Sequence, residues 1–335
     1  MDFLAGMILK GIVAIACIVV GVLYGHWYKR HLANRRYCTS DPVLKGKTVL
    51  ITGSDSGIGR VTALDLAQRG ARVILACLNL QKAEDVAKDI KSSTGNSDVV
   101  VRHLDLSSLQ SVREFAQQII ETEDRLDILI NNAGVAYVPP GTVTRDNFDY
   151  VFGTNHFGHF LLTNLLLDLL KKSALKRVIV VSSCFHTVSP KPNMTREDSA
   201  VGNFLYPHLR EYAISKLANT LFARELARRE ASSGFVSVSL HPGVILSPLW
   251  KSSFSSGSIS RMVYYALFPF MRALLIDETA GAQTTLHCAL DESVAKLSGK
   301  YFDNCAEYEP SPFAQDDELA KELWTVSCEA TGLKY

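Results

Sequence analysis

The sequence has little net charge of either sign. Its 35 Lys and Arg residues nearly balance its 34 Asp and Glu residues, which leaves a formal net charge of +1. Proteins that bind nucleic acid through its phosphates carry a strongly basic surface, so we expect no nucleic-acid partner. Hydrophobic residues make up 47% of the chain and charged residues 21%, a balance typical of globular proteins.

The cysteines form no pattern typical of a metal site or of a disulfide-rich protein. There are seven, none lies in a C-x-x-C pair, and they are spread along the chain. We therefore expect no zinc site and no disulfide framework, and interpret them as mostly buried thiols of a protein in a reducing compartment. They are Cys17, Cys38, Cys77, Cys184, Cys288, Cys305 and Cys328.

The sequence also lacks internal repeats and low-complexity tracts. Only the basic segment 29–46 has the character of a linker. This favours a single domain over residues 47–335, including C-terminal segments that would cover a substrate. The linker would join this domain to an N-terminal anchor at residues 1–28.

The N-terminal anchor is predicted from the most apolar stretch of the chain, residues 3–28. Gly11–Gly25 contains no charged residue, and Lys10 could extend its ammonium group toward the interface. A bilayer core of roughly 30 Å requires about 20 mainly apolar helical residues, which this stretch supplies. Trp27 and Tyr28 lie where interfacial aromatic residues are favoured. We predict one transmembrane helix.

Positive charge follows this stretch rather than preceding it. The basic residues after it are Lys29, Arg30, Arg35 and Arg36. Their excess over Lys10 and the terminal amine predicts that the domain faces the cytosol. A cleaved signal peptide would carry its basic residues first, and a core helix is not expected before the first strand of the domain. We expect the endoplasmic reticulum membrane, with a mitochondrial membrane as the minor alternative.

From Lys47 onward, short β-branched runs alternate with segments of helical periodicity. Near-continuous apolar runs are expected where helices cover both faces of a parallel sheet. The alternation therefore predicts an α/β fold with a doubly wound, parallel, seven-stranded sheet of Rossmann type. The predicted strands are 48–52, 73–76, 99–101, 126–130, 178–181, 236–240 and 300–302.

A glycine-rich turn follows the first predicted strand. Residues 52–59 read T-G-S-D-S-G-I-G, and a helical pattern begins directly afterwards. Glycines allow the backbone to approach a pyrophosphate, which a helix N-terminus attracts. The spacing differs from the standard G-x-G-x-x-G fingerprint, and a purely structural loop is the alternative interpretation. Its place between strand and helix favours a dinucleotide site formed by Gly53, Ser54, Ser56, Gly57, Ile58 and Gly59.

Two further motifs carry groups that could transfer a proton. Tyr212 and Lys216 form a Y-x-x-x-K pair, which lies on one face of a helix. An ammonium group beside a phenol lowers the tyrosine pKa, so the tyrosine can act as general acid or base. Ser182 and Ser183 follow the fifth predicted strand, where a hydroxyl group faces the ligand crevice. Separately, each motif is also compatible with a solvated helix face or a satisfied strand end.

Together these motifs resemble the short-chain dehydrogenase/reductase family. T-G-x-x-x-G-I-G is its cofactor motif, and the segment 131–134, N-N-A-G, follows the fourth predicted strand as in that family. The resemblance covers residues 45–305 and implies an oxidoreductase that acts on CH–OH groups with NAD(P)(H). It adds as cofactor-binding residues Cys77, Leu78, Asp105, Leu106, Asn132, Ala133, Gly134, Tyr212, Lys216, Pro242, Gly243 and Ser247.

The resemblance also implies roles for four catalytic residues. Ser183 would hydrogen-bond the substrate oxygen, and Tyr212 would transfer the proton. Lys216 would hold the nicotinamide ribose and keep the tyrosine acidic, and Asn155 would hold a water that connects the lysine to solvent. The nearby pair His156 and His159 has no carboxylate or cysteine partner in the sequence, so we predict no metal.

Several segments resemble the membrane-bound retinol dehydrogenase subgroup. They are residues 73–77, 157–164, 215–219, 281–284 and 323–328. This implies a retinol/retinal-type substrate; a steroid, polyprenol or fatty aldehyde is an alternative. The apolar segment 262–275 could line a hydrophobic entry or simply pack in the domain. A low-turnover NAD(P)-binding scaffold on the membrane is the remaining alternative, and a homo-oligomer is left open.

The choice between NAD and NADP depends on the residues after the second strand. NAD sites place a carboxylate there, whereas NADP sites place an arginine. The carboxylate position is Cys77 and the following position, often arginine in the subgroup, is Leu78. Nothing repels a 2′-phosphate, and Arg60 and Lys82 could replace the missing arginine. The resemblance favours NADP(H), with NAD(H) as the alternative.

Overall fold

The computed structural model describes residues 34–190, 209–245 and 276–334. The predicted anchor 3–28, the segment 262–275 and Ser247 lie outside these ranges. None of the helices in the described ranges is long and apolar enough to cross a membrane. The compact unit that contains the sheet extends over Tyr37–Tyr335 and so begins before Lys47, the predicted start of the domain.

Eight strands form one sheet in the described part of the chain. Their bounds are β1 Thr48–Thr52, β2 Arg72–Cys77, β3 Val99–His103, β4 Ile128–Asn131, β5 Arg177–Val181, β6 Val236–His241, β7 Tyr301–Asp303 and β8 Ala306–Tyr308. They lie in the order β3-β2-β1-β4-β5-β6-β7-β8. The first seven pair in parallel, as predicted, and β8 pairs antiparallel with β7.

The prediction of a seven-stranded sheet was therefore one strand short. Strand β8 has only three residues, all partly or fully exposed, so it has no apolar run that a sequence pattern could reveal. It follows β7 through a tight turn in which Asn304 and Cys305 both have positive φ values, 52° and 55°. Neither residue is glycine, so the turn carries no obvious sequence signal either.

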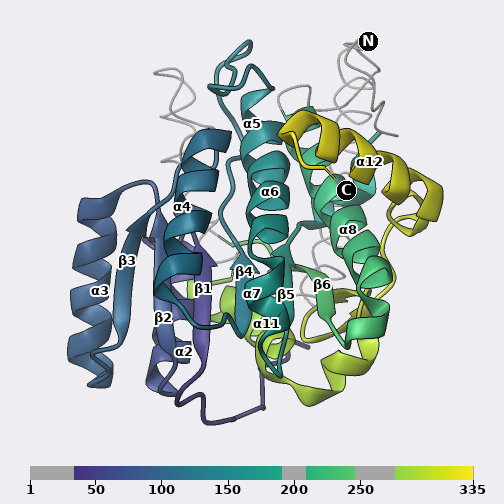
Figure 1. Cartoon of the computed structure of the whole chain (residues 1–335). Helices are drawn as coiled ribbons and strands as arrows, with labels where there is room; N and C mark the ends of the chain where they lie inside the picture. Colours follow the sequence, from purple (N-terminus) through teal and green to yellow (C-terminus); the bar gives the residue numbers. More distant parts are fainter. Residues whose placement is uncertain (1–33, 191–208, 246–275, 335) are drawn as a thin grey trace, which may run out of the picture. The chain divides into compact units, whose positions relative to one another are not determined.

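Helices cover both faces of the sheet (Figure 1). One layer contains α2 Gly57–Gln68, α3 Leu80–Thr94 and α11 Glu278–Leu290; the other contains α4 Leu109–Thr122, α6 Gly158–Leu165 and α8 Arg210–Arg229. This double cover explains the continuous apolar runs: all five residues of β1 are buried, and so are all five of β5.

The remaining described helical segments are short or follow the main layers. They are α5 Tyr150–Phe152, α7 Leu167–Lys171, α12 Asp317–Thr331, the π-helical turn η2 Gly153–Phe157 and the 3₁₀ turns η3 Cys184–Val188, η5 Ala231–Ser233, η6 Glu292–Leu297 and η7 Pro312–Gln315. Segments α5, η2 and α6 are continuous, so the helix that the sequence predicts around Asn155 contains a π turn. Such turns are rare and often lie at functional sites.

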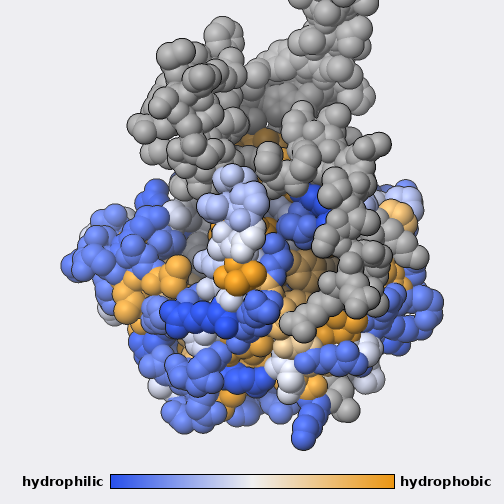
Figure 2. Space-filling view, turned by 90° about the horizontal axis from the view of Figure 1, so that it is seen from above, coloured by the Kyte–Doolittle hydropathy of each residue, from blue (hydrophilic) through white to orange (hydrophobic). Residues whose placement is uncertain are grey.

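The sheet also has a clear switch point. The chain first extends from β1 outward to β3 and then returns to place β4 on the other side of β1. In doubly wound sheets, ligands bind at the carboxyl ends of the strands beside such a reversal. Seen from above the carboxyl edge, hydrophobic surface lies among hydrophilic residues of the rim (Figure 2).

The C-terminal helix α12 packs on α8 and completes the core. Trp324 is buried, with its ring centre 5.0 Å from that of Phe160 and 5.9 Å from that of Phe222. The guanidinium carbon of Arg229 lies 4.4 Å from the Trp324 ring centre. The helix therefore stabilises the same layer that carries the Y-x-x-x-K motif.

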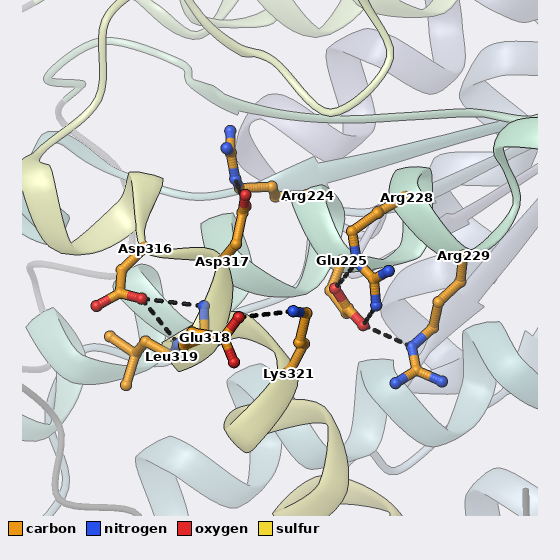
Figure 3. Close-up of polar contacts among 9 residues, drawn as sticks. All are labelled: Arg224, Glu225, Arg228, Arg229, Asp316, Asp317, Glu318, Leu319 and Lys321. Carbon is orange, nitrogen blue, oxygen red and sulfur yellow. Dashed lines mark hydrogen bonds and ion pairs between the residues drawn. The ribbon is translucent and has the colours of Figure 1, made fainter.

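Charged groups border this contact (Figure 3). Arg224 of α8 donates to Asp317 of α12 at 2.7 Å, whereas Arg228 and Arg229 both donate to Glu225 on their own helix. The side chain of Glu225 is almost fully buried, so its two guanidinium partners balance a charge that would otherwise be costly to bury. Arg228 and Arg229 thereby keep the Glu225 carboxylate paired beside the α8–α12 contact.

Residues that precede β1 also pack on the domain. Leu44 is buried, the Ser40 hydroxyl donates to Asp291 Oδ2 at 2.7 Å, and Arg69 binds Asp41 at 2.6 Å. The Cys38 amide donates to Gln283 Oε1 of α11 at 3.1 Å. These contacts explain why the compact unit includes residues that the sequence analysis assigned to the linker.

Candidate active site

A cavity of about 330 Å³ opens at the carboxyl ends of the central strands. Most of the predicted site residues line it, although they come from distant parts of the chain. They are Gly53, Ser56, Gly57, Ile58, Gly59, Asn132, Ala133, Gly134, Ser183, Tyr212, Lys216, Pro242 and Gly243. The switch point of the sheet is thus where the cofactor motif and the Y-x-x-x-K motif meet.

The glycine-rich turn forms one end of this cavity. Gly53 and Gly57 have φ values of +64° and +57°, which disfavour other residues. A Cβ atom on Gly59 would lie 2.5 Å from the carbonyl oxygen of Gly53 and 2.6 Å from Asn132 Nδ2. Helix α2 begins here with no side-chain cap, so its first amide groups can bind an anion. The turn fits a dinucleotide pyrophosphate.

A buried hydroxyl group connects this turn to the loop after β4. Thr52 Oγ1 accepts hydrogen bonds from the amides of Asn132 at 2.9 Å and Ala133 at 3.0 Å. It also lies 2.8 Å from Nε2 of His159, whose Nδ1 lies 3.0 Å from the carbonyl oxygen of Asn155. Because that carbonyl can only accept, Nδ1 carries the proton and Nε2 accepts the threonine hydrogen.

This arrangement assigns a role to His159 that the sequence did not suggest. Burial lowers its pKa to about 4, so the ring is neutral at physiological pH. His159 therefore serves as a hydrogen-bonding link between β1 and the π turn. His156 is also fully buried and lies 2.9 Å from Ser327 Oγ of α12. No cluster of metal-binding side chains occurs among the described residues.

Asn155 lies at the centre of the π turn. Its Oδ1 accepts from the amide of Val135 at 2.8 Å, and its Nδ2 donates to the carbonyl of Val135 at 2.8 Å and to Ser215 Oγ at 3.0 Å. A Cβ atom on Gly134 would lie 3.4 Å from Asn155 Oδ1 and 3.5 Å from Lys216 Nζ. The asparagine and lysine thus approach the same glycine, and Asn155 ties the β4 loop to α8.

Three of the predicted catalytic residues, Ser183, Tyr212 and Lys216, come together at the other end of the cavity. Lys216 Nζ lies 5.5 Å from the centre of the Tyr212 ring and donates to the carbonyl of Val181 at 2.9 Å. The Ser182 hydroxyl donates to the carbonyl of Lys216 at 2.7 Å, which fixes it to α8. The side chain of Ser183, unlike that of Ser182, hydrogen-bonds the side chain of Tyr212. Ser183 is therefore the serine whose hydroxyl group lies beside the phenol.

Burial determines the protonation states of Tyr212 and Lys216. It raises the pKa of Tyr212 well above its usual value, an effect that the hydrogen bond with Ser183 opposes and the neighbouring Cys184 increases. Burial also lowers the pKa of Lys216 to about 8. Loss of solvent therefore sets the direction of the Tyr212 pKa in this structure, and the lowering expected from Lys216 does not outweigh it. At neutral pH the phenol is neutral and the lysine mostly charged.

Other predicted cofactor residues lie outside the cavity lining. Cys77 is buried with its Sγ 3.5 Å from Ser54 Oγ, so its side chain points into the protein. Leu78 is 59% exposed. Asp105 is buried and accepts from the Ser107 amide at 2.9 Å. Leu106 is buried too, and Ser247 lies outside the described residues.

Comparison with known proteins identifies the family. The family model described as short chain dehydrogenase matches residues 47–195. Human retinol dehydrogenase 13 is 45% identical over 297 residues, which cover 89% of this chain and 88% of that protein. The chain belongs to the short-chain dehydrogenase family. Mouse retinol dehydrogenase 12 is 43% identical and covers 89% of this chain and 90% of its own, which places the chain in a retinol dehydrogenase-like subgroup.

Solved structures agree with this assignment. A mycobacterial protein of unknown function (Mycobacterium paratuberculosis) is 33% identical, with a TM-score of 0.67 over 89% of this chain and 98% of that one. A Shigella flexneri short-chain dehydrogenase complexed with NADP is 25% identical, with a TM-score of 0.59 over 79% and 100% of the two chains. As a short-chain dehydrogenase, the protein is an oxidoreductase of CH–OH groups that uses a nicotinamide cofactor.

The close contact at Gly59 gives a direct test of the cofactor end. Gly59→Ala should weaken binding of nicotinamide cofactor by about 10-fold or more, because a Cβ atom must displace both the Gly53 carbonyl and the Asn132 side-chain amide. Titration of cofactor fluorescence measures this. Val61→Ala, a half-buried position in the same helix, is the control and should bind normally. Unchanged binding by folded Gly59→Ala would refute the assignment of this turn.

Proposed function

We propose that this short-chain dehydrogenase interconverts a lipophilic alcohol and its aldehyde or ketone, with a retinol/retinal-type pair as substrate. One observation carries the chemistry: Ser183, Tyr212 and Lys216 converge at one end of a cavity whose other end is the glycine turn. The retinol dehydrogenases of human and mouse, similar over most of the chain, support the substrate class.

In the proposed mechanism, the substrate oxygen lies between Ser183 and Tyr212. The nicotinamide, when bound, supplies or accepts the hydride. For reduction, Ser183 donates a hydrogen bond to the carbonyl oxygen and Tyr212 transfers its proton to it. Because Tyr212 is buried and neutral, it holds the proton that this step needs. The Lys216 ammonium, 5.5 Å from the ring centre, then stabilises the remaining phenolate.

Asn155 has a positioning role in this proposal. It holds Val135 and Ser215 together, and it approaches Gly134 on the side where Lys216 Nζ lies. From this place it would order the water through which the lysine exchanges protons with solvent. A membrane-tethered scaffold with little turnover is the alternative to an enzyme. It is disfavoured by the convergence of the four candidate catalytic side chains, Ser183, Tyr212, Lys216 and Asn155.

The decisive variant is Tyr212→Phe, which keeps the ring and removes the proton. Turnover of all-trans-retinal, followed by nicotinamide absorbance, should fall by about 10²- to 10⁴-fold. Tyr308→Phe, on the partly exposed edge strand β8, is the matched control and should retain activity. A steroid ketone, a polyprenal and a fatty aldehyde should be turned over less well. Cofactor binding without turnover of any of these compounds would favour the scaffold.

For the cofactor, we propose NADP(H). The position that holds a carboxylate in NAD sites is the buried Cys77, so no charge there opposes a 2′-phosphate. Leu78 is exposed but has no group that binds phosphate. Lys82, in the first turn of α3, is half-exposed, and its Nζ lies 3.4 Å from Asp55 Oδ2 at the rim of the glycine turn. It is the cation that we propose for the phosphate.

Lys82→Ala should therefore affect one cofactor more than the other. The KM for NADPH should rise by about 10-fold, as for loss of a hydrogen bond to a charged group, and the KM for NADH should stay unchanged. Lys88→Ala, an exposed lysine on the same helix, should alter neither value. Equal effects on both cofactors, or a lower KM for NADH than for NADPH in the wild-type enzyme, would contradict the proposed site.

We further propose that the enzyme is anchored in the endoplasmic reticulum membrane by residues 3–28, with the catalytic domain in the cytosol. The apolar stretch and the basic residues after it support this. Asn193-Met194-Thr195 is an N-glycosylation sequon, and in the cytosol it carries no glycan. Treatment of the expressed protein with a glycosidase should leave its electrophoretic mobility unchanged.

A matched control shows whether this sequon can be glycosylated at all. When residues 1–28 are replaced by a cleavable signal peptide, the domain enters the lumen and Asn193 should gain a glycan, which Asn193→Gln removes. A glycan on the native chain would overturn the proposed orientation.

A further inference from the structure

His186 lies in the turn next to Ser183, at the end of the cavity where the proposed reaction takes place. It has no role in the mechanism proposed above. It belongs to the 3₁₀ turn η3, which begins directly after Ser183, and its side chain is almost fully buried. Its ring centre lies 4.7 Å from that of Tyr301 on β7. The ring therefore stands between the serine turn and the C-terminal part of the domain.

Both ring nitrogens of His186 have backbone partners. Nδ1 lies 2.7 Å from the carbonyl oxygen of Ser183, and Nε2 accepts from the amide of Ser311 at 3.1 Å. A backbone amide only donates and a carbonyl only accepts, so Nε2 must be unprotonated and Nδ1 must carry the proton. Only the neutral ring in this tautomer satisfies both ends, and burial lowers the pKa of His186 in the same direction.

The same turn determines where the Ser183 hydroxyl lies. Ser183 Oγ accepts from the amide of Phe185 at 3.3 Å, and the carbonyl of Ser183 also accepts the amide of His186 at 3.2 Å. The Phe185 ring packs edge-on against Tyr212, with 5.7 Å between ring centres. A shift of this turn would move the serine hydroxyl relative to the tyrosine.

We propose that His186 is a positioning residue for Ser183, which it holds in place by bridging the serine carbonyl to the backbone of Ser311. The segment that precedes α12 thereby helps to set the geometry of the reaction. The proposal rests on the proposed function, in which the Ser183 hydroxyl binds the substrate oxygen. A displacement of that hydroxyl by about 1 Å would lower turnover by up to about 10²-fold without any loss of cofactor binding.

Ser311 offers a substitution that breaks the bridge from the backbone side. Its φ of −59° is one that proline adopts, and in Ser311→Pro the ring Cδ replaces the amide hydrogen, cannot donate to His186 Nε2 and displaces it. Ser311→Ala keeps the amide and deletes the hydroxyl, which donates to the His186 carbonyl at 3.4 Å. The two variants separate the bond to the histidine ring from the other contact of the same residue.

The expected result is a kcat for retinal reduction about 10- to 100-fold lower in Ser311→Pro and near the wild-type value in Ser311→Ala. The dissociation constant for NADPH should be the same in both. The primary deuterium isotope effect on hydride transfer should increase in Ser311→Pro, because the chemical step becomes slower. A folded Ser311→Pro with normal kcat would overturn the inference.

A double-mutant cycle distinguishes positioning from a general structural effect. If His186 acts through Ser183, Ser311→Pro should cause no further loss in a Ser183→Ala background, whereas independent effects would multiply. Multiplied effects would overturn the inference. Wild-type activity in Ser183→Ala alone would instead overturn the proposed function, so the two failures differ.

A further variant avoids dependence on the folding of Ser311→Pro. His186→Asn places its amide near the Nδ1 position, so it can keep the bond to the Ser183 carbonyl but loses the acceptor for Ser311. It should lower kcat as Ser311→Pro does, and again without effect in the Ser183→Ala background. A normal kcat in His186→Asn would likewise overturn the proposed bridge.

Discussion

The hydroxyl group of Thr52 holds together three parts of the chain that meet at the end of β1. It accepts from two amides of the loop after β4 and lies against the neutral ring of His159. Thr52 is fully buried, so each of these polar groups would be costly to leave unpaired. The network therefore fixes the two strands that flank the switch point, and it does so beside the glycine turn.

The residues proposed to carry the reaction depend on the same network. From Thr52 the hydrogen bonds continue through His159 to the backbone of Asn155, whose side chain binds Ser215 of α8. Tyr212 and Lys216 lie on either side of Ser215 along that helix. The glycine turn and the helix that carries Tyr212 and Lys216 are thus placed by one continuous set of buried bonds, which in the proposed mechanism favours a fixed distance between hydride and proton transfer.

Local patterns in the sequence were sufficient for the parallel strands, the glycine turn and the family, because these depend on neighbouring residues. Strand β8 was missed because it is short and exposed. The roles of His159 and His186 were missed because each depends on a partner far away in the sequence, Thr52 and Ser311. The Y-x-x-x-K spacing indicated that Tyr212 and Lys216 are neighbours, but it contains nothing about their burial, which decides the direction of the tyrosine pKa.

Burial shifts the pKa values of Tyr212 and Lys216 in opposite directions. It disfavours charge on both, so Tyr212 keeps its proton, while the pKa of Lys216 falls only to about 8 and the lysine is still mostly charged at neutral pH. A neutral phenol is the form needed to reduce a carbonyl, and a phenolate is the form needed to oxidise an alcohol. Alkaline pH favours the phenolate but also discharges Lys216, whose ammonium group stabilises it. In the proposed mechanism, the reductive direction therefore needs no change of protonation at neutral pH, whereas the oxidative direction requires removal of a proton from Tyr212 while Lys216 remains charged.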